Sequence, residues 1–342
     1  MKLTFGDARG LATDLLTAAG LAPEKAATTA RCIVIADLWQ VGSHGLLRLP
    51  YYLRRIEAGG YPADAELTTV ADSGPVLALD GGGGLGHWQL WQAAELAAAR
   101  CARYGIAAVS LANSGHSGAL GLYTVPGLQV GQLTLAFANG PAVMPAWGGA
   151  RPLLSTSPLA AGIPTRPRPT LVDLATSAVA RGKIAAHAAN GTALPPGWAF
   201  DATGQPTVDP QAALHGLLAP LGGAKGFALA LLVEAIAGGL AGPRLAVEVP
   251  DMFTESDAAR PQRLGHLLIA LDPARFGDAA EIQDRLDRLA AAVLDGGGRL
   301  PGAGRQLPSE TDDEQILDIP EKLGAELAGW ASQRGVQVVL RE

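Results

Sequence analysis

The chain has 342 residues, of which 48% are hydrophobic and 17% charged, and its formal net charge is −6 at pH 7. This composition is typical of a globular protein and excludes a disordered one. No Lys/Arg cluster is longer than Arg54-Arg55, so the sequence lacks the basic patches typical of nucleic-acid-binding proteins, and we expect no nucleic-acid partner.

The N-terminal part is predicted to be helical. Apolar periodicity predicts helices over 5–20 and 23–40, and Pro50 opens a third over 51–58 that ends at Gly59-Gly60. Charged residues interrupt the first apolar stretch, which argues against a signal peptide. Cys32 and Cys101 lie in apolar helical patterns without metal-ligand spacing. We therefore expect buried thiols, no metal, and a reducing, cytoplasmic setting.

From residue 67 the pattern changes to alternating strands and helices. Strands are predicted at 75–80, 106–111, 133–137 and 170–173, with a helix over 88–104. This alternation indicates an α/β fold. A turn-rich stretch, 195–210, is followed by a helix over 227–239, strands at 245–250 and 266–271, and a helix over 279–294. The tail is predicted to end in a short helix and an edge strand at 336–340.

The longest apolar run, 227–242, is interrupted by Glu234. We read it as too short to span a bilayer and expect a soluble protein with no membrane partner. No linker of low complexity separates the parts of the chain. We therefore divide it into a helical part, 1–72, an α/β region with a helical insertion, 73–298, and a C-terminal part, 299–342, that returns to the helical domain.

A glycine run at 81–86 satisfies the G-x-G-x-x-G pattern of Rossmann dinucleotide sites between a predicted strand and helix. Four consecutive glycines satisfy many patterns by chance. The next strand ends at Leu111-Ala112-Asn113, without the acidic residue that binds a ribose hydroxyl, and His87-Trp88 would crowd a pyrophosphate. A structural turn is the favoured interpretation.

The segment Ser43-His44-Gly45 lies at a predicted junction between two helices. Its glycine lets a ligand approach the backbone, and a histidine exchanges protons near neutral pH. Arg48 can bind a carboxylate in two places. If the segment is helical, His44, Arg48 and Tyr52 share one face, although Pro50 weakens that helix. Taken alone, the segment fits a helix junction with a surface histidine better than an active site.

Three other polar clusters follow predicted strands or precede helices. Residues 113–119 fit a ligand site and a simple turn equally well. For 173–177 and for 221–226, helix capping is favoured over phosphate binding when each is taken singly, with Thr176 or Ser177 as the cap and Lys225 as an added charge.

Taken together and in order, the segments resemble the type-2 malate/L-lactate dehydrogenase family, which is distinct from the Rossmann-fold lactate and malate dehydrogenases. The resemblance covers roughly residues 5–310. The matching motifs are Ser43-His44-Gly45 with Arg48 and Tyr52, then residues 113–118, 145–160, 173–177, 180–183, 195–210, 220–226, 272–276 and 301–302.

The resemblance implies a largely antiparallel sheet in the cofactor domain, a helical domain made from both chain ends, a homodimer, and NADH or NADPH as cofactor. It implies a small 2-oxo acid and its 2-hydroxy acid as substrates. His44 is then the acid/base, with Ser43, Arg48 and Lys183 in the catalytic group, and Arg48, Tyr52 and His116 contact substrate. The implied cofactor-binding residues are His116, Ser117, Gly118, Ala119, Leu120, Thr156, Asp173, Leu174, Ala175, Thr176, Gly222, Gly223, Lys225, Gly226 and Arg305.

Two departures from the family pattern bear on function. Ser157 stands where the family often has Asn, and one arginine, Arg305, remains of a late basic pair. The cyclic-imine reductase branch usually has an acidic residue at the position of Lys183, so Lys183 favours the 2-hydroxy acid branch. Reduction of a cyclic imine such as piperideine- or pyrroline-2-carboxylate stays open, as does a non-catalytic nucleotide-binding regulator. The sequence does not decide between NADH and NADPH.

Overall fold

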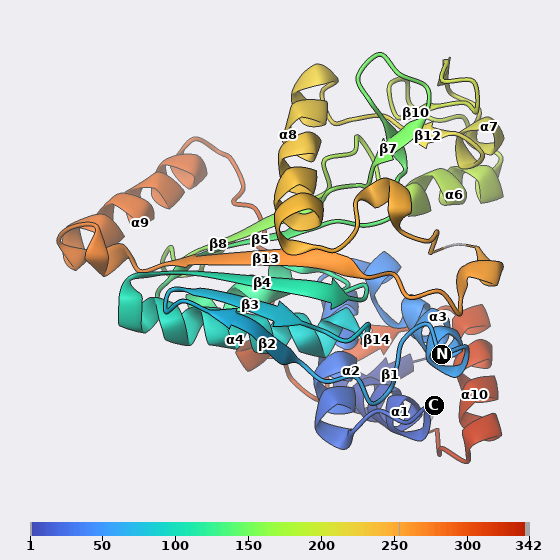
Figure 1. The fold of residues 1–342 in the computed structure, drawn as a ribbon, viewed down its shortest axis with the longest axis horizontal. Coiled ribbons are helices and arrows are strands. Elements are labelled where there is room, and N and C mark those ends of the chain that lie inside the picture. Colours follow the sequence, from blue (N-terminus) through green and yellow to red (C-terminus); the bar gives the residue numbers. More distant parts are fainter. Residues whose placement is uncertain (1, 253, 339–342) are drawn as a thin grey trace.

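The two ends of the chain meet in one helical part (Figure 1). The computed structural model describes residues 2–252 and 254–338. Strand β1 (Lys2–Thr4) pairs antiparallel with β14 (Ile316–Asp318). Helices α1 (Phe5–Ala18) and α3 (Leu49–Glu57) pack with α10 (Glu321–Arg334), and α2 (Pro23–Leu38) packs on α1. The predicted helical domain from both termini is confirmed.

A seven-stranded sheet forms the centre of the molecule, in the order β2-β3-β4-β13-β5-β8-β9. Of its neighbouring pairs, β3–β4 is parallel and the others are antiparallel. A Rossmann sheet is mostly parallel, so the predicted non-Rossmann, largely antiparallel fold is confirmed. The strands are β2 (Thr68–Asp72), β3 (Val76–Asp80), β4 (Ile106–Ser114), β13 (Leu264–Leu271), β5 (Leu133–Ala138), β8 (Leu159–Ile163) and β9 (Thr170–Leu174).

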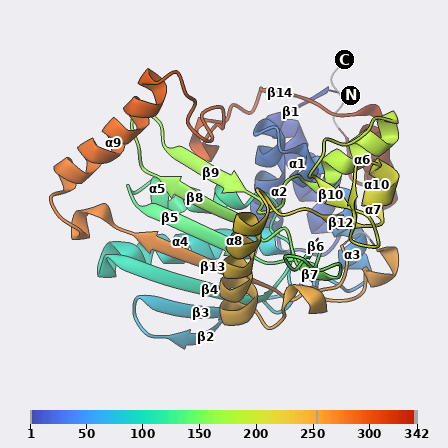
Figure 2. The same cartoon turned by 90° about the horizontal axis from the view of Figure 1, so that it is seen from above.

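Helices cover both faces of this sheet (Figures 1 and 2). Helix α4 (Gly86–Tyr104) packs on β4 and β13, with short α5 (Val125–Leu128) beside it. Helix α8 (Ala224–Glu234) lies on the opposite face and continues as a π-helical segment, Ala235–Ala241, against β13. The near-continuous burial of β13 explains why its sequence is apolar apart from the buried His266.

A third part has its own small core, which includes Met144, Ile184, Leu194 and Leu218. Its elements are β6 (Met144–Pro145), β7 (Pro152–Leu154), α6 (Arg181–Asn190), β10 (Ala199–Phe200), β11 (Pro206–Thr207), α7 (Pro210–Leu214) and β12 (Leu217–Leu218). The predicted turn-rich stretch therefore contains two two-residue strands in a small sheet ordered β11-β10-β12.

The strand predicted at 245–250 is wrong. Ala246–Glu248 is a single 3-10 turn, and the Glu248 carboxylate accepts a hydrogen bond from the Leu245 N–H at 2.8 Å. This local contact replaces strand pairing, and Pro250 has no N–H to donate to a sheet. The predicted edge strand at 336–340 falls partly on 339–340, which lie outside the described residues, and 336–338 form no strand.

Helix α8 and its π-helical continuation form one apolar helix, Ala224–Ala241, with a mean hydropathy of 1.6. By length and composition alone this helix is long enough to cross a membrane. The expectation that the apolar run at 227–242 is too short to do so is therefore wrong. Buried core helices of soluble proteins meet the same criterion, and 39% of this helix is buried. Leu231, Leu232 and Leu240 on it are 48%, 54% and 75% exposed.

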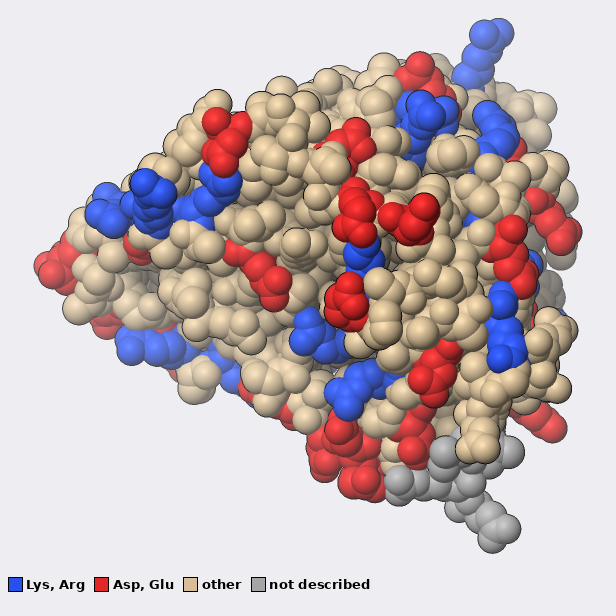
Figure 3. Space-filling model, turned by 60° about the horizontal axis from the view of Figure 1, so that its bottom comes forward, with Lys and Arg blue, Asp and Glu red and all other residues tan. Residues whose placement is uncertain are grey.

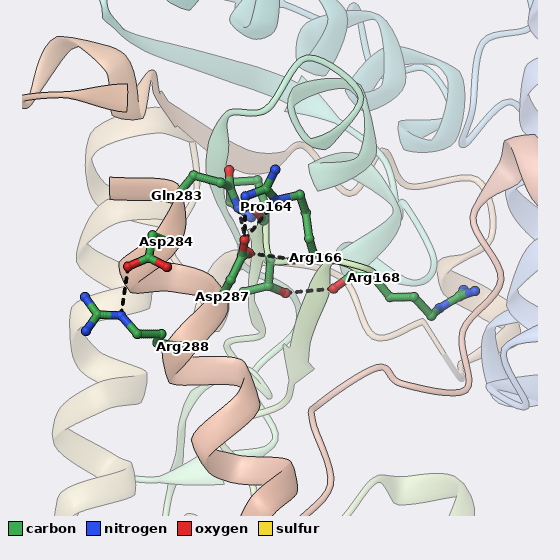
Figure 4. A network of polar contacts seen from close by, with 8 residues as sticks. Pro164, Arg166, Arg168, Gln283, Asp284, Asp287 and Arg288 are labelled. Atoms are coloured by element: carbon green, nitrogen blue, oxygen red, sulfur yellow. Dashed lines mark hydrogen bonds and ion pairs between the residues drawn. The ribbon is translucent and has the colours of Figure 1, made fainter. Parts of the chain in front are cut away.

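Helix α9 (Ala279–Asp295) projects from the body (Figures 1 and 2). Polar contacts attach it to the segment after β8: Asp287 accepts from Arg166, and Gln283 donates to the Pro164 carbonyl (Figure 4). Its buried set consists of Ala290 alone among its described residues. Basic and acidic side chains are interspersed over the molecular face in Figure 3.

Candidate active site

The Ser43-His44-Gly45 segment is a double turn between α2 and α3. Two 3-10 turns, Gly42–His44 and Leu46–Arg48, follow one another with extended Gly45 between them. His44 and Arg48 therefore do not share an α-helical face with Tyr52, because α3 begins only at Leu49. The turns are tied together by Arg48, whose Nε donates to the Ser43 carbonyl at 2.9 Å.

His44 faces His116, which follows the end of β4. The two imidazoles stack with centroids 5.5 Å apart and planes at 20°. The Ser43 hydroxyl lies 2.9 Å from Nδ1 of His44. The structure thus brings together three predicted site residues, Ser43, His44 and His116, from two segments that are distant in the chain.

The hydrogen bonds of His116 define its tautomer. The Gly118 N–H points at His116 Nδ1 at 3.3 Å, and a backbone N–H can only donate. Nδ1 is therefore an acceptor, and the Tyr52 hydroxyl donates to it at 2.8 Å. In the neutral ring the proton then sits on Nε2, which makes His116 a hydrogen-bond donor toward any ligand beside that atom.

Burial keeps both imidazoles neutral. It lowers the pKa of His44 to about 4, and the positive charge of Arg48 adds to this effect. Burial likewise lowers the pKa of His116 well below its ordinary value, with smaller contributions from His44 and His87. Both shifts favour uncharged imidazoles near neutral pH, beside the Arg48 guanidinium.

Tyr52 lies behind His116 and is fully buried, so it supports that ring and does not line an open surface. The edge of its ring meets His87, with centroids 4.8 Å apart. His87 is fully buried at the start of α4 and gathers with His116 and His44. In the sequence His87 stands out only as an obstacle to a Rossmann site, because nothing local shows that it approaches His116.

The loop after His116 leads to Asp173 at the end of β9. Ser117, Ala119 and Leu120 are buried, and Gly121 packs directly on the Asp173 side chain. Asp173 accepts an ion-paired hydrogen bond from Arg305 at 3.1 Å. Burial raises the pKa of Asp173, and Arg305 opposes that shift. These two predicted cofactor residues are thus partners of each other, while Leu174 and Ala175 remain partly exposed.

Thr176 joins two other predicted segments. Its hydroxyl donates to the Thr156 carbonyl at 2.9 Å, and its own carbonyl accepts from the Leu221 N–H at 2.8 Å. Thr176 and Ser177 do not cap a helix, because α6 begins only at Arg181 and has no side-chain cap. The helix-capping interpretation of these two residues is therefore wrong. Instead, the hydrogen bonds of Thr176 hold Thr156 and the turn before α8 next to the end of β9.

The start of α8 is an uncapped helix N-terminus preceded by Gly222 and Gly223, both with positive φ. Lys225 is exposed in its first turn. Gly226 has a different reason to be glycine, since a Cβ there would overlap the Leu221 backbone. The close packing against Leu221 explains why this position is glycine.

Lys183 lies in the first turn of α6. A Cβ built on neighbouring Gly182 would lie 4.0 Å from Ser43 Cβ, so this turn approaches the double turn that carries His44. Lys183 itself is exposed.

The glycine run at 81–86 is a packed structural turn. A Cβ on Gly84 would overlap Ala65 and Gln89, and one on Gly86 would overlap the Gly115 carbonyl. The N-terminus of α4 is therefore covered by protein, which excludes a pyrophosphate there and confirms the structural interpretation.

Comparison with known proteins agrees with this geometry. A family model described as malate/L-lactate dehydrogenase matches residues 3–328. The chain is 36% identical over 334 residues to a (2R)-3-sulfolactate dehydrogenase (NADP(+)) of Chromohalobacter salexigens, covering 97% of this chain and 98% of that protein. It is also 36% identical over 332 residues to a Delta(1)-pyrroline-2-carboxylate reductase of Ancylobacter novellus, covering 96% of each.

Solved structures give the same result. Sulfolactate dehydrogenase from Methanocaldococcus jannaschii matches with a TM-score of 0.91 at 27% identity, over 99% of this chain and 98% of that one. A delta1-piperideine-2-carboxylate reductase from Pseudomonas syringae matches with a TM-score of 0.88 at 29% identity, over 97% and 100%.

The chain belongs to the malate/L-lactate dehydrogenase family. It is an NAD(P)-dependent oxidoreductase of the kind that interconverts 2-oxo and 2-hydroxy acids or reduces cyclic imino acids, which sets aside the non-catalytic regulator.

Proposed function

We propose that the enzyme interconverts a small, doubly acidic 2-oxo acid and its 2-hydroxy acid, with His44 as the acid/base. The stacked pair of His44 and His116, joined to Ser43 and flanked by Arg48, carries this proposal. Arg48 binds the carboxylate next to the reacting carbon. His116, through Nε2–H, donates to the substrate oxygen and orients it, and Ser43 holds the His44 ring.

The low pKa of His44 defines its part in each direction. In oxidation, neutral His44 takes the proton of the substrate hydroxyl. In reduction it must be protonated, and with a pKa of about 4 roughly one ligand-free molecule in a thousand is protonated at pH 7. The negative charge of a bound dianion and of the developing alkoxide favours the imidazolium. Substrate binding therefore supplies the electrostatic condition for proton transfer.

The residues present fit a nicotinamide dinucleotide. Gly222 and Gly223 have no Cβ to block the N–H groups at the uncapped start of α8, and Lys225 adds positive charge for a phosphate. Thr176 brings this turn to Thr156, and β9 leads from there to Asp173 beside Leu120 and Gly121. When bound, the nicotinamide supplies or accepts the hydride at the substrate's C2.

A second acidic group on the substrate is favoured by the first turn of α6. This turn approaches Ser43 and carries the exposed Lys183, whereas the neighbouring Arg181 donates to the Leu214 carbonyl. A sulfonate or carboxylate on C3 would face positive charge and helix N–H groups there. Sulfolactate-like and malate-like acids meet this requirement.

Reduction of a cyclic imino acid is the second candidate. A pyrroline-2-carboxylate reductase is as similar to the chain as the sulfolactate dehydrogenase. The same His44 and Arg48 would serve an imine nitrogen and a single carboxylate. A cyclic imino acid has no second acidic group for Lys183 to bind, so Lys183 distinguishes the two candidates.

We also propose that the enzyme is a homodimer that buries the apolar faces of α8 and α9. Leu231, Leu232 and Leu240 on the first helix, and Leu289 and Leu294 on the second, are 48% to 75% exposed. A two-fold axis buries each such patch twice, so a second copy of the chain is a suitable occupant. Cys32 and Cys101 are free and buried, which suits the cytoplasmic setting we propose.

His44→Ala should lower turnover by roughly 100- to 10,000-fold, the usual contribution of a general acid or base. NADPH affinity, measured by fluorescence titration, should stay near the wild-type value because His44 holds no phosphate. His215→Ala, at an exposed position after α7, serves as the control and should keep full turnover. Wild-type turnover in His44→Ala contradicts the assignment.

Nicotinamide absorbance followed against a panel of 2-oxo acids and cyclic imines, with NADPH and with NADH, tests the substrate class. Oxo acids with a second acidic group should give the highest kcat/KM. Lys183→Ala should lower kcat/KM for those acids about tenfold or more, with little effect on pyruvate. Cyclic imines as the best substrates, unaffected by Lys183→Ala, would establish the second candidate instead.

Sedimentation should give twice the chain mass of 34.9 kDa for the wild type. Leu232→Glu places a charge on the exposed face of α8 and should yield monomers, whereas Ile316→Glu on exposed β14 should not. A monomeric wild type at micromolar concentration overturns the dimer.

A further inference from the structure

Asp37 lies directly beneath the catalytic turn. It belongs to the last turn of α2, and its Oδ2 accepts a hydrogen bond from the Leu46 N–H at 2.7 Å. Neither the family motifs nor the polar clusters in the sequence point to it, because a carboxylate at the end of an amphipathic helix usually faces water.

The Leu46 N–H that bonds Asp37 lies at the break between the two 3-10 turns. His44 N–H bonds to the Val41 carbonyl and Gly45 N–H to that of Gly42, after which Gly45 is extended, with φ −89° and ψ −150°. This conformation interrupts the turn, so Leu46 N–H receives its acceptor from α2 and not from the turn itself. Leu46 is fully buried, and a buried N–H without an acceptor costs about 1–3 kcal/mol.

Gly45 is fitted to this carboxylate. A Cβ at position 45 would overlap all three atoms of the Asp37 carboxylate group. The φ of Gly45 is one that any residue adopts, so its absent side chain is explained by close approach and not by backbone strain. Asp37 and Gly45 are thus complementary in shape.

Asp37 has no ion-pair partner among the causes that shift its pKa. Burial raises that pKa to about 6, and the hydrogen bond from Leu46 opposes the rise. The carboxylate does not bond the His44 ring, since His44 Nδ1 faces Ser43. The arrangement is therefore not a serine–histidine–aspartate triad, and Asp37 acts on the backbone.

We propose that Asp37 is the positioning residue that fixes the Ser43–Arg48 turn, and with it the places of His44 and Arg48, through the Leu46 N–H. The inference rests on the proposed role of His44. Because Arg48 bonds the Ser43 carbonyl, the double turn moves as one unit. Release of Leu46 displaces both the proton carrier and the carboxylate-binding guanidinium.

Two substitutions of Asp37 test this role, with Asp14→Ala on the exposed face of α1 as the control. Asp37→Ala should lower kcat 10- to 100-fold and raise the KM of the acid, while the Kd for NADPH changes less than twofold. Asp37→Asn keeps an acceptor oxygen and should retain kcat within about threefold. A purely structural role would instead lower thermal stability with kcat unchanged in the folded fraction.

Gly45→Ala provides the reciprocal test. The new methyl group pushes the carboxylate away from Leu46 and should reproduce the kinetics of Asp37→Ala. In the double variant Asp37→Ala/Gly45→Ala the methyl fits the vacated space, so kcat should be no lower than in Asp37→Ala alone. Effects that multiply overturn the proposal.

Amide hydrogen exchange makes the test independent of substrate. Residues 42–48 should exchange faster in Asp37→Ala than in the wild type, and at the wild-type rate in Asp37→Asn. Unchanged exchange overturns the positioning role whatever the substrate proves to be. Faster exchange with unchanged kcat shows that Asp37 holds the turn but that catalysis does not depend on it. If only the proposed function is wrong, the wild type will be inactive on the substrate panel while the exchange differences between the variants remain.

Discussion

The stacking of His44 on His116 joins the helical part of the chain to the central sheet, and the rest of the site is arranged around this contact. One ring is carried by the double turn between α2 and α3, and the other by the loop that follows β4. Each is supported from behind: His44 by the turn that Asp37 anchors, and His116 by the Tyr52 hydroxyl and the Gly118 N–H. The site is preorganised because both supports come from packed elements.

Burial affects the two imidazoles alike, and their different hydrogen-bond partners give them different roles. Removal from water lowers both pKa values and so favours the uncharged form of each ring near neutral pH. His116 has its proton fixed on Nε2 by its donors, which makes it a constant hydrogen-bond donor. His44 has Ser43 as its neighbour and Arg48 nearby, so an arriving anion can change its protonation. The direction of proton flow is thus coupled to the charge of the substrate.

Much of the fold follows from sequence pattern, whereas the site does not. The long amphipathic helices and the apolar strands β4, β5 and β13 were predictable from periodicity. Strand β8 is Leu-Ala-Ala-Gly-Ile, too small in its side chains to give a strand signal, and residues 245–250 have apolar residues but turn chemistry. His44 and the cofactor loops were identified through ordered family motifs. Tyr52 behind His116, the Asp173–Arg305 pair and Asp37 under Gly45 depend on packing between distant segments, which no local pattern encodes.

Proton transfer in this site depends on a His44 that titrates near pH 4 and a His116 that is protonated only on Nε2. Nitrogen NMR of histidine-labelled protein from pH 4 to 9, assigned with His44→Ala and His116→Ala, measures both directly. We expect an unprotonated Nδ1 on His116 throughout and a His44 midpoint near pH 4. A proton on Nδ1 of His116, or a His44 midpoint near 6.5, would contradict it.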